Sequence, residues 1–338
     1  MTARSARPTM KDVADHVGVS RQLVSLVMRD LGGVSATTRE RVLRAAEEMG
    51  YRPDASARLL RQRRSYQIGV LYAMHQPFEV DLVEHLFTAA RERGYAVVLG
   101  PLSPSRPQAM VVEELLQQRI EALIVLATDG GRATCGALKS RDLPVVQLSG
   151  PRTTPPGDDI RVDNAEGMEL AIEHLTGLGH TRIAHIDGGM GPNADERRDA
   201  YLAAMARRGL TEQAEIVPSA YDEDAGSAAA SALLERAELP TAITCANDRC
   251  AFGVIETLVR TGIRIPDDVS IVGYDDSSIA SLRFLQMTTI RHDPAILSAL
   301  AVEAVVDRLS GTNVAPWARR VRAQLVIRST TGAPRVLS

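Results

Sequence analysis

The chain has 338 residues, of which 45% are hydrophobic and 24% charged, with 39 lysines and arginines against 42 aspartates and glutamates. This ordinary composition excludes collagen-like, low-complexity and wholly disordered proteins, and the length predicts two or three structural units. The three cysteines (Cys135, Cys245 and Cys250) lack a CxxC spacing, which excludes a zinc framework and favours a reducing compartment. The sequence contains neither a signal-peptide pattern nor a membrane-spanning apolar run, so we expect a cytoplasmic protein.

Charge is unevenly distributed along the chain. Residues 1–66 contain 13 basic and 7 acidic residues, whereas the remainder contains 26 basic and 35 acidic residues. A basic end on an acidic body is typical of a protein that contacts phosphate with one end only. A solvated basic helical surface is the alternative, and the local motif has to decide between them.

The first predicted elements are two short helices joined by a turn. Thr9 is a candidate N-cap for the segment MKDVADHV, and Ser20 is a candidate N-cap for RQLVSLVMRD. A helix-turn-helix needs a small residue at the crossing, a glycine at the turn and a β-branched residue facing back. Ala14, Gly18 and Val24 fill these places at offsets of four and ten.

A third helix is predicted at Thr37–Met49, with Ser35 or Thr37 as its cap and Gly50 at its end. Together the three helices form a predicted DNA-binding headpiece over residues 1–52. The alternative is a plain three-helix bundle without a DNA-binding role.

Longer runs of sequence then resemble the LacI/GalR family of transcriptional regulators. The resemblance begins with MKDVADHVGVSRQLVSLVMR and VSATTRERVLRAAEEMGYRPDASARLLRQRRSYQIGVL. It continues through VDNAEG, EHLTGLGHTRIAHIDGG, ANDRCAFG, IPDDVSIVGYDD and TTIRHD, and so covers about the full length.

The resemblance implies that the second helix enters the major groove of DNA. The base-contacting positions implied are Arg21, Gln22, Ser25 and Leu26. The usual family pattern Thr-Val-Ser-Arg reads Leu-Val-Ser-Leu here, so Leu26 offers only apolar contact and the operator is expected to differ from the common family site. Arg29 replaces a residue that is usually asparagine and is expected to meet phosphate.

A hinge segment is predicted at residues 53–66. The resemblance implies that two such hinge helices pair across a dimer in the minor groove, with Ala57 at the close-packing position and Leu60 at the wedge position. A helix this short is unstable alone, so a flexible basic linker is the alternative. Both interpretations can hold if the segment is unstructured in the free protein and helical when bound to DNA.

The body, residues 67–338, alternates apolar strand-like runs with amphipathic helical stretches. The runs occur at 67–73, 95–100, 121–127, 144–149, 182–187, 241–246 and 269–274. The helical stretches occur at 79–92, 107–118, 164–177, 194–208, 224–236, 249–262 and 293–309. This order predicts an α/β fold of doubly wound parallel sheets in two lobes, about 67–165 and 166–290. The resemblance also implies that the body folds like periplasmic sugar-binding proteins, with three strand crossovers between the lobes. The carboxy-terminal part is then expected to return partly to the first lobe.

Candidate effector residues follow the predicted strands, since ligands bind at the carboxyl ends of such sheets. Those carried by family motifs or strand-end loops are Tyr72, Phe78, Ser149, Arg197, Tyr221, Asn247, Asp275 and His292. Asp275 and Asn247 could instead cap helices, Arg197 could be a surface arginine, and Asp248 and Asp276 are interpreted as caps. In the first lobe the familiar Asn-Pro-Phe segment reads Gln76-Pro77-Phe78.

Other chemistries have little support. His174 and His180 face opposite sides of a helix without further ligands, so no metal site is predicted and both are interpreted as interdomain packing and capping residues. The glycine run at 188–191 matches neither a P-loop nor GxGxxG. No cofactor is implied, and no GxSxG or HExxH motif indicates an enzyme. A solute-binding protein would lack the headpiece.

We therefore expect a repressor that binds a pseudo-palindromic DNA operator as a homodimer. A small molecule, by resemblance a carbohydrate, would bind between the lobes and change operator affinity. Neither the sign of the response nor the effector follows from the sequence.

Overall fold

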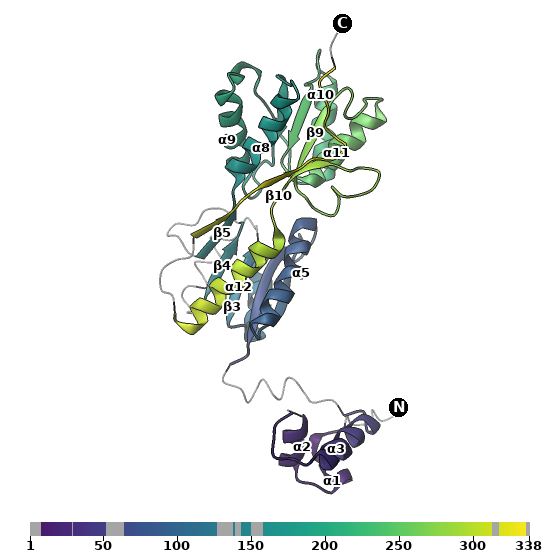
Figure 1. The fold of residues 1–338 in the computed structure, drawn as a ribbon, viewed down its shortest axis with the longest axis vertical. Coiled ribbons are helices and arrows are strands. Elements are labelled where there is room, and N and C mark those ends of the chain that lie inside the picture. Colours follow the sequence, from purple (N-terminus) through teal and green to yellow (C-terminus); the bar gives the residue numbers. More distant parts are fainter. Residues whose placement is uncertain are drawn as a thin grey trace. The chain divides into compact units, whose positions relative to one another are not determined.

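The structure, a computed structural model, describes residues 8–28, 30–51, 64–126, 138, 143–149, 158–312 and 318–335. The chain divides into two compact units, Met1–Ser65 and Tyr66–Ser338 (Figure 1). The predictions for Arg29, Ala57 and Leu60, and for nearly all of the hinge segment, lie outside the described residues.

The amino-terminal unit contains the predicted helices α1 (Met10–Val17), α2 (Arg21–Met28) and α3 (Ala36–Glu48). Thr9 and Asp12 form a capping box at the start of α1, because each side chain accepts the other's backbone N–H. Gly18 ends α1 with a φ of 74°, a left-handed conformation that favours glycine. The Ser20 hydroxyl accepts the N–H of Leu23 at 3.2 Å and so starts α2.

The core of this unit is small and closely packed. Val13, Val24 and Val42, one from each helix, are fully buried, and Ala14 is 2% exposed. Ala14 and Val24 therefore lie in the interior, as the helix-turn-helix pattern predicts.

The second unit contains two lobes. In the first lobe six parallel strands have the order β11-β5-β4-β3-β1-β2. Their bounds are β1 (Gln67–Ala73), β2 (Ala96–Leu102), β3 (Ala122–Leu126), β4 (Val145–Leu148), β5 (Asp158–Val162) and β11 (Ala318–Val321). The helices α5 (Pro77–Glu92) and α12 (Pro294–Ser310) pack on one face, and α6 (Gln108–Gln117) packs on the other.

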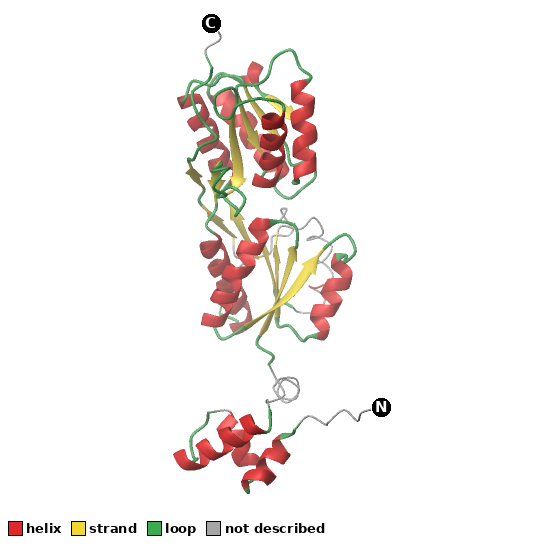
Figure 2. Ribbon diagram, turned by 90° about the vertical axis from the view of Figure 1, so that its right-hand side faces the viewer, coloured by secondary structure: helices red, strands yellow, loops and turns green. Residues whose placement is uncertain are grey.

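The second lobe repeats this plan with the order β12-β10-β9-β8-β6-β7, in which only β12 is antiparallel to its neighbour. Its strands are β6 (Ile183–Ile186), β7 (Glu215–Val217), β8 (Ala242–Cys245), β9 (Ser270–Asp275), β10 (Thr288–Arg291) and β12 (Gln324–Val326). Its helices are α8 (Asn164–Gly177), α9 (Ala194–Arg207), η1 (Thr211–Gln213), α10 (Glu223–Leu234) and α11 (Asp248–Arg260). Helices cover both faces of each sheet (Figure 2).

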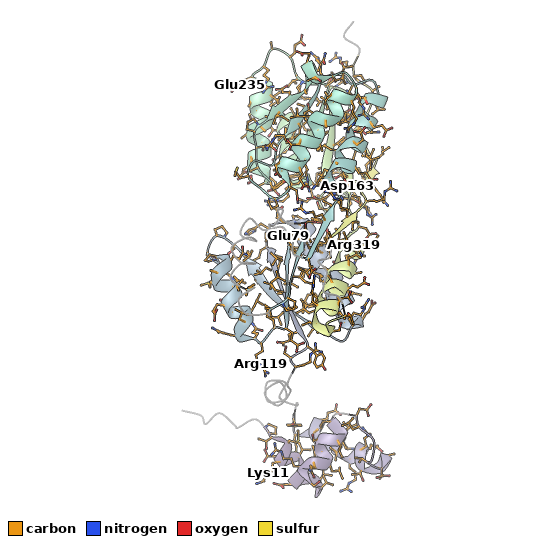
Figure 3. All side chains as sticks on the ribbon, turned by 90° about the vertical axis from the view of Figure 1, so that its left-hand side faces the viewer. Lys11, Glu79, Arg119, Asp163, Glu235 and Arg319 are labelled. Carbon is orange, nitrogen blue, oxygen red and sulfur yellow. The ribbon has the colours of Figure 1, made fainter. Side chains whose placement is uncertain are left out.

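The chain passes between the lobes three times: from β5 to α8, from β10 to α12, and from β11 to β12. Asp163 lies at the first of these crossovers (Figure 3). Because α12 and β11 return to the first lobe, the lobes are discontinuous in sequence. No helix among the described residues is long and apolar enough to cross a membrane.

Strand β5 lies outside the predicted apolar runs. Its sequence DDIRV carries three charged residues, which interrupt the hydrophobic pattern. Two of these charges are paired by distant residues, since Arg308 bonds both oxygens of Asp158 at 2.6 Å and Glu196 accepts from Arg161 at 2.6 Å. The third, Asp159, pairs with Arg161 of the same strand. Strands β7, β10 and β11 are likewise short and outside the predicted runs.

Candidate functional site

A cavity of about 550 Å³ lies between the two lobes, at the carboxyl ends of their strands. Seven of the predicted effector residues line it: Phe78, Ser149, Arg197, Tyr221, Asn247, Asp275 and His292. Tyr72 does not line the cavity; it is half-buried against the core of the first lobe. Glu79, which also lines the cavity, lies at the end of the first lobe that faces the second (Figure 3).

Arg197 lies on the first turn of α9, and each of its three guanidinium nitrogens contacts a polar group that helps to fix the side chain. Its Nε donates to Asn164 Oδ1 at 3.1 Å, its Nη1 donates to the carbonyl of Ala246, and its Nη2 lies 3.5 Å from Asp275 Oδ1. The guanidinium carbon lies 3.7 Å from the ring centroid of Tyr274, within cation–π range. The side chain is therefore a buried, oriented group, which excludes the alternative of a surface arginine.

The carboxylate of Asp275 shares this buried environment. Burial raises the pKa of Asp275 to about 6, while the positive charge of Arg197 opposes the shift. Asp248 lies nearby and accepts hydrogen bonds from the backbone and hydroxyl of Ser277 at 2.7 and 2.9 Å and from the Thr289 hydroxyl at 2.7 Å. Burial and the charge of Asp275 raise the pKa of Asp248 to about 8. Asp248 thus anchors the loop after β9, and its interpretation as a helix cap is wrong.

Asn247 is the residue that caps α11. Its Oδ1 accepts the N–H of Cys250 at 2.9 Å, and its Nδ2 points across the cavity to the Tyr221 carbonyl at 3.3 Å and Gln76 Oε1 at 3.4 Å. Asn247 therefore both caps α11 and lines the cavity.

Tyr221 forms an aromatic wall that depends on the glycine run after β6. A Cβ atom at Gly188 would lie 2.6 Å from Cζ of the ring, and one at Gly191 would also collide with the ring. The Tyr221 hydroxyl donates to the carbonyl of Pro192 at 2.7 Å, and burial raises its pKa to about 12. The glycine run at 188–191, which matches no phosphate-binding motif, thus makes room for the ring of Tyr221.

His292 lies in the second crossover and is 1% exposed. Neither ring nitrogen has a hydrogen-bond partner among the described residues, and burial holds its pKa well below the usual value. Its ring lies 5.0 Å from that of Tyr274 and 6.5 Å from that of Phe78. Neutral, partnerless nitrogens on the cavity wall are suited to bonding a polar ligand.

Sequence reasoning missed several polar cavity residues: Gln76, Glu79, Gln108 and Asn193. Asn193 Nδ2 donates to the carbonyl of Ser149 at 2.8 Å, so it joins the two lobes. Each of the four lies immediately before a helix or in its first turn, after a strand. Their position at a helix start in a βα unit could have identified them from the sequence, since helix starts face the carboxyl edge of the sheet, where ligands bind.

His174 and His180 hold the carboxy-terminal segment in place. His174 Nε2 lies 2.9 Å from the Thr331 hydroxyl, and His180 Nε2 lies 2.8 Å from the carbonyl of Gly332. Both contacts are within the second lobe, so the interpretation of these histidines as interdomain residues is wrong. The described part of the chain contains no cluster of three or more metal-binding side chains.

The amino-terminal unit presents one exposed face of α2. Arg21, Gln22 and Leu26 are exposed and Ser25 is half-buried, whereas Val24 points into the core. No hydrogen bond or ion pair joins the Arg21 or Gln22 side chain to another described residue, so both are available to a partner.

Comparisons with known proteins agree with this architecture. The family model for bacterial regulatory proteins of the lacI family matches residues 9–54, and that for a periplasmic binding protein-like domain matches residues 172–331. The ribose operon repressor of Escherichia coli (strain K12) is 31% identical over 312 residues, which are 89% of this chain and 93% of that protein.

Two solved structures are similar over most of the chain. A LacI transcriptional regulator from a Rhodococcus species is 40% identical with a TM-score of 0.76, covering 79% of this chain and 98% of that one. The lac repressor dimer bound to operator and the anti-inducer ONPF is 30% identical with a TM-score of 0.82, covering 96% and 99%.

Proposed function

Because the chain belongs to the LacI family of bacterial regulatory proteins, we propose that it is a sequence-specific DNA-binding repressor controlled by a small-molecule effector. The effector is a sugar or sugar derivative bound in the cavity between the lobes. The protein acts in the cytoplasm as a homodimer on a pseudo-palindromic operator and catalyses no reaction. One observation carries the proposal: the same chain contains both an exposed recognition helix and a polar cavity between two lobes.

The headpiece supports the DNA-binding role through the exposed face of α2. Arg21 has the geometry to bond guanine O6 and N7, and Gln22 to bond adenine N6 and N7. Ser25 and Leu26 lie on the same face one turn later, where Leu26 can contact a thymine methyl. Arg29, Ala57 and Leu60 complete the proposed set, the first on phosphate and the other two in the minor groove.

The cavity supports a polyhydroxylated effector. Amides, carboxylates and a fixed arginine can make paired hydrogen bonds to hydroxyl groups, and Tyr221 and Phe78 can cover the apolar face of a sugar ring. The ribose operon repressor and the operator-bound lac repressor dimer, which are similar over most of the chain, agree with this proposal. Control of DNA affinity then follows if the effector binds one lobe arrangement better than another.

Selection of bound sequences from random duplex DNA at about 150 mM salt tests the DNA-binding role, since nonspecific phosphate binding is weak there. We expect a palindrome to be enriched. Arg21→Ala should weaken binding to that sequence by roughly 5- to 150-fold, the equivalent of about 1–3 kcal/mol for one base-contacting arginine.

Arg44→Ala is the matched control, because Arg44 is also an exposed headpiece arginine but lies on α3, paired with Glu40. A selection without enrichment, or equal losses for both variants at every sequence, would contradict base recognition by α2. For the effector, thermal melts with a panel of neutral sugars that includes D-ribose should show stabilisation of the wild type. Asp275→Asn should lose that stabilisation and still bind operator.

A further inference from the structure

A partly buried chain of hydrogen bonds leads from the pocket arginine to the first lobe. Arg197 and Glu196 are neighbours on the first turn of α9, and their side chains meet at Asn164. Asn164 Oδ1 accepts Arg197 Nε and the Tyr274 hydroxyl, both at 3.1 Å, and Asn164 Nδ2 donates to Glu196 Oε2 at 3.0 Å. One amide therefore orients the cavity arginine and the adjacent carboxylate together.

The carboxylate of Glu196 continues the chain across the lobe boundary. Glu196 Oε1 accepts Arg161 Nη1 at 2.6 Å, and Arg161 Nε donates to Asp159 Oδ2 at 2.5 Å. Arg161 and Asp159 belong to β5 in the first lobe, whereas Glu196 belongs to α9 in the second. The ion pair thus spans the boundary between the lobes.

The position of Asn164 makes this chain sensitive to lobe rotation. Asn164 is the first residue of α8, directly after the crossover from β5. It is 1% exposed and the side chain of Arg161 is 7% exposed, whereas the side chain of Glu196 is 21% exposed, so the two groups that donate to Glu196 are shielded from water. Gly167, one turn later in α8, leaves space for the Tyr274 hydroxyl, since a Cβ there would lie 3.1 Å from Cζ of that ring and closer to its hydroxyl.

We propose that Asn164 and Glu196 are positioning residues that link the pocket arginine to β5, so that a molecule which moves Arg197 changes the angle between the lobes. The inference rests on the proposed function only in taking the cavity as the effector site. Buried bonds of this kind have discrete arrangements, which is the physical requirement for transmitting a binding event.

The test measures the distance between the lobes by fluorescence energy transfer and needs neither DNA nor a ligand. Dyes are attached at Gln117→Cys in the first lobe and Glu212→Cys in the second, two exposed positions, with Cys135 replaced by serine. Cys245 and Cys250 are buried and stay unlabelled. The labelled chain is diluted into excess unlabelled protein, so that transfer occurs within one chain.

Asn164→Asp replaces the amide nitrogen that donates to Glu196 with a second carboxylate oxygen, which would repel the Glu196 carboxylate, and we expect a shift in the interlobe distance. Glu196→Gln alone should shift it less. The double variant Asn164→Asp/Glu196→Gln exchanges donor and acceptor, because the new amide on α9 can donate to the new carboxylate on α8 and still accept from Arg161. The double variant should return the distance to that of the wild type, which a merely structural role would not do.

Glu169→Gln is the matched control, because Glu169 also pairs with two arginines, Arg207 and Arg208, but entirely within the second lobe. It should leave the interlobe distance unchanged. The proposal is overturned if Asn164→Asp behaves as Glu169→Gln does, or if the double variant stays shifted. Should Asn164→Asp fail to fold in thermal melts, the shift of Glu196→Gln relative to Glu169→Gln decides the question.

Discussion

Gly253 lies where α11 crosses α10, and an alanine at this position would force the two helices apart. An added Cβ would lie 2.8 Å from the carbonyl carbon of Glu223 and closer still to its oxygen, whereas real Cβ atoms essentially never approach within 3.0 Å. The obstacle is backbone, so no flexible side chain can move aside. Overpacking of this kind costs about 3 kcal/mol, and replacing a helical glycine by alanine returns about 1 kcal/mol. We therefore expect a net loss of about 2 kcal/mol, equivalent to a fall in Tm of roughly 4–8 °C.

The matched control is Gly177→Ala, at the end of α8, where an added Cβ meets nothing within 4 Å. The same change should there stabilise the protein by up to about 1 kcal/mol. Denaturant unfolding followed by circular dichroism measures both variants. Since Asn247 caps α11 and lines the cavity, helix separation should also weaken effector binding. A Gly253→Ala variant as stable as Gly177→Ala would contradict a steric clash at this crossing.

Three further predictions concern pH, the headpiece core and a buried ion pair. Burial raises the pKa of Asp275 from 3.8 to about 6, so the penalty for its charge is present above pH 6 and disappears as pH falls below 4. As pH falls from 7 to 4, the unfolding free energy of the wild type should therefore rise by up to about 3 kcal/mol relative to that of Asp275→Asn. A difference in unfolding free energy between the two proteins that stays constant over this pH range would contradict this prediction. Val24→Ala removes two methyl groups from a fully buried side chain and should cost the headpiece about 2 kcal/mol of local stability. Amide hydrogen exchange in α1–α3 should therefore accelerate roughly 30-fold, and unchanged exchange would contradict this prediction. Arg308→Ala removes the guanidinium that bonds both carboxylate oxygens of the buried Asp158, and denaturant unfolding should show a loss of about 3–5 kcal/mol, with a smaller loss for Arg308→Lys; equal losses would argue against the paired geometry.

Local sequence determined the headpiece and most elements of the body. Thr9 and Ser35 both cap helices and Gly18 ends one, because capping and left-handed turns depend on residues within one turn of helix. The alternation of apolar runs and amphipathic stretches predicted both lobes, since strand and helix periods differ. The family motifs predicted Arg197 and Asn247 as residues of the cavity, and the structure places both on its wall.

Tertiary structure decided what depends on partners far apart in the chain. Strand β5 forms despite its charges because Arg308 and Glu196, from other helices, neutralise Asp158 and Arg161. The same dependence gives Asn247 a second role beside capping and makes Asn164 a junction between pocket and lobe boundary. No local pattern encodes these contacts, because a buried polar side chain is stabilised only once folding brings its partner within hydrogen-bond distance.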